Sequence, residues 1–213
     1  MQNFTGMRPV SFRFDRDKLI HVLAFFSGHG IADLTKLKAA KLVYFLDKQH
    51  LWQHGRPVVG GPYFCMPFGP VPGRALQTMN DIIDSADLVL PFIDASEKMI
   101  KDYLDVKEDG IHPRFVAKRD FDPETFSLSE LQALENVRAQ YGHLSAGQLV
   151  DLTHQDPTWT TPNKNRALGG RENIPYHLFF EDASPDVRKI WELIEAEQED
   201  RETDDCLEAD LIA

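Results

Sequence analysis

One pair of histidines, and one histidine close to two carboxylates, have the types and spacing that metal binding or acid–base chemistry could use. His50 and His54 lie four residues apart, which places both rings on one face of a helix. No nearby cysteine or carboxylate completes the three or four ligands of a zinc site, and two histidines near a helix C-terminus interact favourably with the helix dipole. We therefore predict neither a metal nor a cofactor.

His154 is the second candidate, because Asp151 and Asp156 lie close to it in the sequence. A histidine beside a carboxylate can act as a general acid or base, but nucleophilic catalysis also requires a nucleophile that converges on that base. The nearby hydroxyls of Ser145 and Thr153 are better explained as a helix cap and a helix-end group. A small hydrolase or transferase that uses His154 is kept as the alternative to a binding protein without catalysis.

The composition is that of an ordinary globular protein. Its 213 residues are 42% apolar and 10% aromatic, which is enough for one core without a metal or disulfide. Cys65 and Cys206 stand apart in the sequence and are expected to be reduced thiols. No apolar run is long enough for a signal peptide or a membrane span, so we expect a cytoplasmic protein without a membrane partner.

The net charge of −11 is distributed unevenly along the chain. Residues 195–213 contain nine acidic residues and one arginine, so this segment alone carries a charge of −8. Neither the segment nor the remainder has the basic character that nucleic-acid binding requires. We predict an N-terminal arm (1–14), one domain (15–194) and an acidic tail (195–213) that is frayed or disordered.

Apolar spacing and capping patterns predict mostly helices. Helices are predicted over residues 15–27, 33–54 and 73–85, and after Ser127, Ser145 and Ser184. The helix at 33–54 is apolar almost all round, so we place it at the centre of the core. The threonines, prolines, asparagines and glycines of residues 156–173 predict a loop.

Strands are fewer and shorter than helices. Residues 96–106 begin with a helical pattern and end extended, and Glu108, Asp109 and Gly110 then separate two alternating runs, which predicts a hairpin. The predicted fold class is α+β and predominantly helical: a single domain with a central buried helix and a small antiparallel sheet.

Residues 62–74 read PYFCMPFGPVPGR and combine four prolines, two glycines and three aromatic residues. Pro70 keeps Gly69 out of the helical region, and Pro72 is well placed to open the helix that follows. The segment therefore predicts a stiff corner that ends an extended piece and directs the next helix. Its apolar character raises the question whether it also contacts a partner.

Several segments of the chain, in the same order and spacing, resemble one family. Residues 41–47 (KLVYFLD), 55–57 (GRP) and 69–72 (GPVP), then the helix start at Ser127 and a tryptophan five residues after His154, are similar to the Panacea domain of SocA-like antitoxins, also described as phage-associated. Pro67 stands where we would expect a polar, often basic, residue.

This resemblance implies a binding protein, not an enzyme. Proteins of this kind neutralise a cognate toxin encoded beside them by direct contact, and some resemble adaptors that deliver the toxin to a protease, for which a AAA+ protease is the expected type. A homo-oligomer is compatible with such a role.

We expect the partner-binding surface around the glycine–proline corner, because aromatic and arginine side chains dominate protein interfaces. The predicted contact residues are Trp52, Tyr63, Phe68, Gly69, Pro70, Val71, Arg74, His154 and Trp159. Arg74 is the most informative, since a cation in the first turn of a helix opposes the helix dipole. The alternative interpretation is that Tyr63, Phe68 and Trp52 are simply buried.

Overall fold

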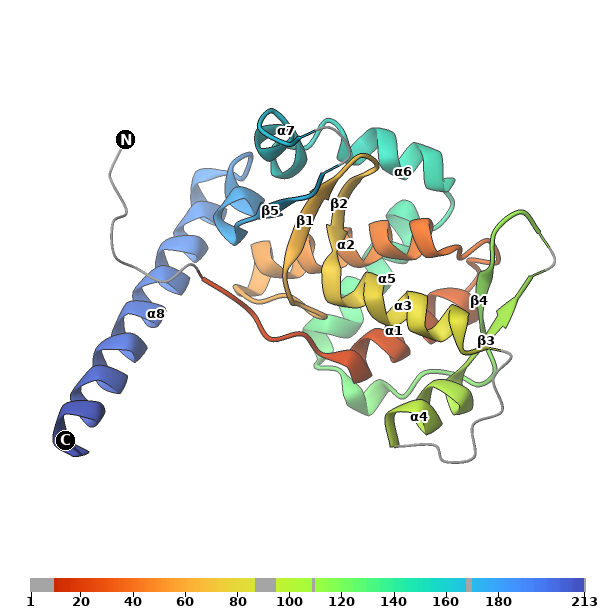
Figure 1. Ribbon diagram of the computed structural model, residues 1–213, viewed down its shortest axis with the longest axis horizontal. Coiled ribbons are helices and arrows are strands. Elements are labelled where there is room, and N and C mark those ends of the chain that lie inside the picture. Colours follow the sequence, from red (N-terminus) through yellow and green to blue (C-terminus); the bar gives the residue numbers. More distant parts are fainter. Residues whose placement is uncertain (1–9, 87–94, 109, 168–169, 213) are drawn as a thin grey trace.

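A central helix organises the structure, which is a computed structural model that describes residues 10–86, 95–108, 110–167 and 170–212 (Figure 1). This helix, α2 (Lys36–His54), begins at Thr35, whose side chain accepts from the Lys38 N–H, and ends at Gly55 with φ of 69°. Helices α3, α5, α6 and α8 and strand β2 all pack against it. The prediction of a central buried helix is confirmed.

Of the remaining helices, those after Ser127 and Ser145 begin at the predicted caps. The remaining helices are α1 (Arg16–Gly28), α3 (Gly73–Asp84), α4 (Ala95–Tyr103), α5 (Leu128–Tyr141), α6 (Ala146–Thr153), α7 (Pro157–Asn163) and α8 (Pro185–Ile212), with 3₁₀ helices η1 (Pro123–Thr125) and η2 (Tyr176–Phe180). Ser127 and Ser145 each form the capping box that the sequence predicts, with Glu130 and Gln148.

Two small antiparallel sheets complete the fold, which confirms the predicted fold class. The first has strand order β2-β1-β5, formed by β1 (Tyr63–Met66), β2 (Gly69–Pro72) and β5 (Glu172–Ile174). The second is the predicted hairpin of β3 (Leu104–Lys107) and β4 (Arg114–Ala117); Asp109, in its loop, lies outside the described residues. Residues 69–72, predicted as a corner, are a paired strand.

The prediction of a loop over residues 156–173 was wrong, because this segment contains α7 and the start of β5. Asp156 begins α7 by accepting a hydrogen bond from the Thr158 N–H, and Pro157 occupies the first helical position, where its missing donor is harmless. An aspartate followed by a proline is a helix-start pattern, and the many threonines and glycines around it obscured that pattern.

Apolar side chains form two cores. The first lies between α1, α2, α3 and α5. The second joins Tyr44, Tyr63 and Cys65 to the side chains of η2 and to one face of α8. The side chains of α8 that pack there are Val187, Ile190, Trp191 and Ile194. Segments after residue 170 are therefore an integral cover over α2 and β1.

Helix α8 continues through the acidic residues to Ile212, and its C-terminal part extends beyond the body of the fold (Figure 1). The division into arm, domain and tail remains a prediction; residues 1–9 of the arm lie outside the described residues. In the described part of the chain, no helix combines the length and apolar character needed to cross a bilayer.

Candidate functional site

The β1–β2 hairpin turns at Pro67 and Phe68, and Gly69 allows the turn to close. Gly69 has φ of 99°, and a Cβ added there would lie 2.5 Å from Lys41 Nζ and 2.5 Å from Thr153 Oγ1. Only glycine fits both the backbone conformation and this close approach. Pro67 lies outside β1, at a turn position that needs no ladder donor, so it removes no hydrogen bond from the strand.

The register explains why two prolines are tolerated in β2. Pro70 faces Cys65 and Pro72 faces Tyr63. Since proline has no N–H, these are the non-hydrogen-bonded pairs, whose backbone groups point away from β1. The outward carbonyl of Pro70 accepts a hydrogen bond of 2.8 Å from Lys41 Nζ. Helix α2 thus satisfies the outer edge of the sheet.

Lys41 is fully buried, and burial lowers the pKa of its ammonium to about 7, with Cys65 acting weakly in the opposite direction. The unfolded chain keeps this proton up to its ordinary pKa of 10.5, so between about pH 7 and 10.5 the folded protein binds fewer protons. The free energy of unfolding should therefore rise with pH from about pH 7, by up to about 1.4 kcal/mol per pH unit from this group.

Denaturant unfolding between pH 7 and 8.5 tests this expectation. Lys41→Met should remove the rise, because the titrating group is gone, although the variant also leaves the Pro70 carbonyl without its donor. Lys98→Met, at an exposed lysine, is the control and should keep the rise. An equal slope in the wild type and Lys41→Met would contradict a depressed pKa.

Asp47, two turns along α2, holds the loop that leads into β1. Its carboxylate accepts hydrogen bonds from the N–H groups of Val58 (2.9 Å), Val59 (2.8 Å) and Gly60 (2.9 Å), and from the hydroxyl of Tyr63 (2.8 Å). Burial raises the pKa of Asp47 to about 6, although these hydrogen bonds act to lower it. Two charged residues of α2 therefore fix the two ends of the hairpin.

The tip of the hairpin is exposed and rigidly held. Phe68 is 64% exposed, and Leu152 of the neighbouring helix α6 is 41% exposed. Trp159 of α7 donates from Nε1 to the Met66 carbonyl at 2.8 Å, and the His154 ring stacks on Trp159 with 4.0 Å between ring centroids. His154 Nε2 is buried and has no partner among the described residues. We call Phe68, Leu152, His154 and Trp159, with Pro67, the hairpin-tip surface.

The structure gathers only part of the predicted contact set at this tip. Phe68 is exposed there and His154 and Trp159 are half-buried, whereas Tyr63, Gly69, Pro70 and Val71 are buried. Arg74 is exposed on α3, beyond the far end of β2, so Phe68 and Arg74 lie at opposite ends of the hairpin.

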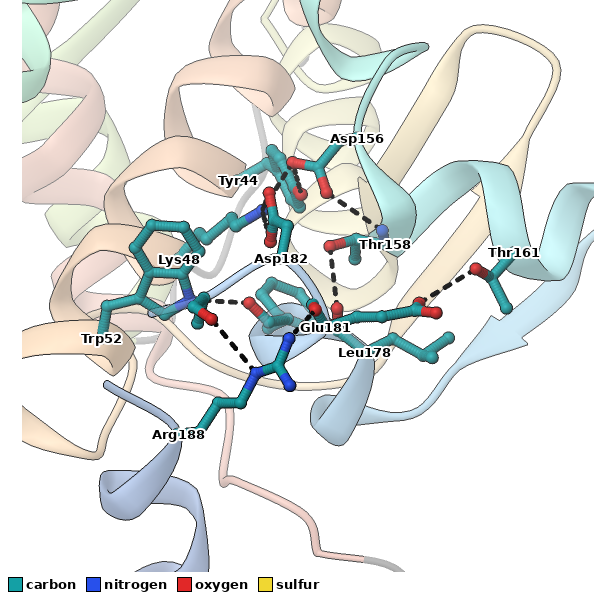
Figure 2. Close-up of polar contacts among 12 residues, drawn as sticks. Tyr44, Lys48, Trp52, Asp156, Thr158, Thr161, Leu178, Glu181, Asp182 and Arg188 are labelled. Carbon is teal, nitrogen blue, oxygen red and sulfur yellow. Dashed lines mark hydrogen bonds and ion pairs between the residues drawn. The ribbon is translucent and has the colours of Figure 1, made fainter. Parts of the chain in front are cut away.

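Trp52 lies apart from the tip, near the C-terminal end of α2. It is half-buried, and its Nε1 donates to the Phe179 carbonyl at 2.6 Å. The ammonium of Lys48 lies 4.8 Å from the centre of its ring, a cation–π contact. Figure 2 shows Trp52 beside the polar contacts that join α2 to the segment after residue 170.

The carboxylates considered for catalysis have other roles. Asp156 Oδ2 accepts hydrogen bonds from the Tyr44 hydroxyl (2.6 Å) and from Lys48 Nζ (2.8 Å). The same ammonium group of Lys48 also donates to Asp182 at 3.1 Å (Figure 2). Burial acts to raise the pKa of Asp156, but Lys48 and the hydrogen bonds keep it below its usual value. Asp151 is exposed, and neither carboxylate is hydrogen-bonded to His154 in the described structure.

His50, from the other candidate pair, is buried and has structural partners. Its Nδ1 lies 2.7 Å from the Arg56 carbonyl and its Nε2 lies 3.1 Å from Ser129 Oγ. Among the described residues, no three histidine, cysteine or carboxylate side chains come together as a metal site.

Comparison with protein-family models decides the family. The model described as the antitoxin SocA-like, Panacea domain matches residues 40–160, more than half of the chain. The chain belongs to this family. No curated protein and no solved structure matches this chain significantly. The Panacea match spans Lys41, Asp47 and the whole hairpin and ends directly after Trp159, so it includes every residue of the hairpin-tip surface.

Reasoning from the sequence assigned no role to Lys41 and Asp47, the two residues that fix the Panacea hairpin. A pattern that could have found them was present. Both are charged residues in the middle of a helix that the sequence places at the centre of the core, and buried charges must be paired or hydrogen-bonded. Their partners are backbone groups 11 to 29 residues away, which local sequence patterns cannot identify.

Proposed function

We propose that this Panacea protein is an antitoxin that neutralises a toxin encoded beside it by direct binding, and that the toxin contacts the hairpin-tip surface. The observation that carries the proposal is Phe68, a large aromatic side chain that is 64% exposed on a turn within the family match. A single exposed apolar residue is ordinary, but this one lies on a rigidly supported turn beside α6, where Leu152 is also exposed.

Rigid support matters because it lowers the entropic cost of association. The turn is tied to α2 through Lys41 and the Pro70 carbonyl, and to α7 through Trp159 and the Met66 carbonyl. A partner that covers Phe68 and Leu152 would bury apolar surface without first having to order the hairpin.

The same geometry favours a binding role without catalysis. The His154 ring stacks against Trp159, and Asp156 is held by Tyr44 and Lys48, so the described residues offer no base and carboxylate that converge on a nucleophile. Delivery of the bound toxin to a AAA+ protease is a further step that family membership suggests. It would shorten the half-life of the toxin in cells that make this protein.

Co-expression tests the proposal. The neighbouring reading frame should be toxic when expressed alone and harmless together with this chain. Phe68→Asp should abolish rescue and weaken binding of the purified toxin by about 2 kcal/mol or more, as expected for a central aromatic contact. Its thermal unfolding midpoint should stay close to that of the wild type, because the side chain is exposed.

Ile111→Asp is the matched control. Ile111 is 94% exposed in the β3–β4 loop, far along the chain from the tip, so this variant makes the same kind of change outside the proposed surface. It should retain full rescue. A neighbour that is harmless alone, or still toxic beside the wild-type chain, would refute the antitoxin role; unchanged rescue by Phe68→Asp would refute the surface.

A further inference from the structure

Three exposed arginines surround the loop that Asp47 holds. Arg13 lies in the segment before α1, Arg56 is the second residue after α2, and Arg74 lies in the first turn of α3. None of the three guanidinium groups makes a hydrogen bond or ion pair with a described residue. Unpaired arginines are notable in a protein whose net charge is −11.

Backbone contacts bring together the segments that carry these arginines. The segment before α1 runs beside the loop, because the Asp15 N–H donates to the Val59 carbonyl at 2.9 Å and the Gly61 N–H to the Phe12 carbonyl at 3.2 Å. Two glycines in the loop permit close contact from either side.

At Gly60, an added Cβ would lie 2.6 Å from the Arg13 carbonyl oxygen and 3.3 Å from the ring of Pro57, the residue after Arg56. At Gly61, it would lie 3.6 Å from the Cβ of Arg74. The glycine pair is therefore the point at which the three arginine-bearing segments meet.

Acidic residues near the loop leave these arginines without counter-charges. Asp15 accepts from the Lys18 N–H as the cap of α1, and Asp47 is buried with four donors around it. Glu195 follows Ile194, which packs next to Gly55, yet it makes no ion pair with Arg56.

Arg74 lies in an unfavourable electrostatic position within the chain. The first turn of α3 contains no acidic residue, and Pro72 provides no side-chain cap, so the positive end of the helix dipole and the arginine have the same sign. A negative charge on a bound partner would interact favourably with both the arginine and the positive end of the helix dipole. In addition, Arg16, in the first turn of α1, has a buried Nε without a described partner.

We propose that Arg13, Arg56 and Arg74 form an arginine surface that binds an acidic segment of the protein partner. The inference rests on the proposed function and adds a second contact region to the hairpin-tip surface. A short acidic peptide segment fits better than a nucleic acid. Salt screens charge interactions beyond about 8–10 Å. A short acidic segment can therefore interact with the three arginines alone, whereas a long duplex would also lie over the rest of a mostly negative protein and be repelled by it.

A labelled peptide of about ten glutamates is the probe, measured by fluorescence anisotropy in low salt, where surface charge interactions are strongest. The wild type should bind it, and Arg13→Glu/Arg56→Glu/Arg74→Glu should bind at least tenfold more weakly. The matched control is Lys98→Glu/Lys107→Glu/Lys118→Glu, which changes the net charge equally at three exposed lysines elsewhere. It should lose much less affinity than the arginine variant.

Three results of the binding measurement would overturn the proposal: no peptide binding by the wild type, equal loss in both triple variants, or tighter binding of a DNA duplex at the same arginines. Circular dichroism should confirm that both variants fold. Rescue by co-expression separates this inference from the antitoxin role. If the wild type and the arginine variant rescue equally, only the proposed arginine surface is wrong. If the wild type does not rescue, the antitoxin role is wrong, and the peptide measurement still tests the arginine surface.

Discussion

Replacing Asp47 with alanine is expected to lower the free energy of unfolding by about 4 kcal/mol or more, which is a large part of the total stability of a typical domain. The variant removes one carboxylate but leaves four donors without an acceptor: the N–H groups of Val58, Val59 and Gly60 and the hydroxyl of Tyr63. Each buried donor without a partner costs about 1–3 kcal/mol. The loop before β1 would also lose its only described side-chain acceptor.

Tyr63→Phe is the comparison for Asp47→Ala. It removes one of the four donors and leaves the carboxylate in place with its three backbone bonds, so it should cost only about 1–2 kcal/mol. Urea denaturation of both variants measures the two values. If Asp47→Ala were no more costly than Tyr63→Phe, the loop would not depend on the carboxylate, and the account of how α2 fixes the hairpin would be wrong.

Gly69→Ala is expected to lower the free energy of unfolding by about 3 kcal/mol, from two separate causes. The first is backbone strain, because φ of 99° is unfavourable for any residue with a Cβ. The second is a clash, since the new Cβ would lie 2.5 Å from both Lys41 Nζ and Thr153 Oγ1. Relief of that clash would displace the hairpin tip, so binding of a partner there should weaken as well.

Gly30→Ala separates the two causes. Gly30 has a similar φ of 95°, but a Cβ added there would meet nothing within 4 Å. This variant should show the strain alone, about 1 kcal/mol. Equal losses in Gly30→Ala and Gly69→Ala would mean that close packing against Lys41 does not restrict residue 69.

These variants concern a hairpin that has support on both sides. Lys41 and Asp47 bind it from α2, within the Panacea match, whereas Tyr176 donates from its hydroxyl to the Gly61 carbonyl at 2.7 Å from outside that match. The second core adds to this support, because side chains of η2 and α8 pack with Tyr44 and Tyr63. The matched region therefore depends on the segment that follows it.

The sequence alone was sufficient for features that depend on neighbouring residues. The capping boxes at Ser127 and Ser145, the helix end at Gly55 and the β3–β4 hairpin all arise from patterns only a few residues long. The fold class followed from these elements, and the family followed from blocks whose order and spacing are visible in the chain.

Only the tertiary structure decided which side chains are available to a partner. Tyr63 and Phe68 lie five residues apart in one apolar stretch, yet one is fully buried by η2 and α2 and the other is exposed. Burial depends on segments more than a hundred residues away, which no local pattern encodes. Contacts between distant segments also explain why the predicted contact residues divide into a hairpin tip and a separate arginine. For the same reason, the roles of Lys41 and Asp47 became visible only with the positions of their backbone partners.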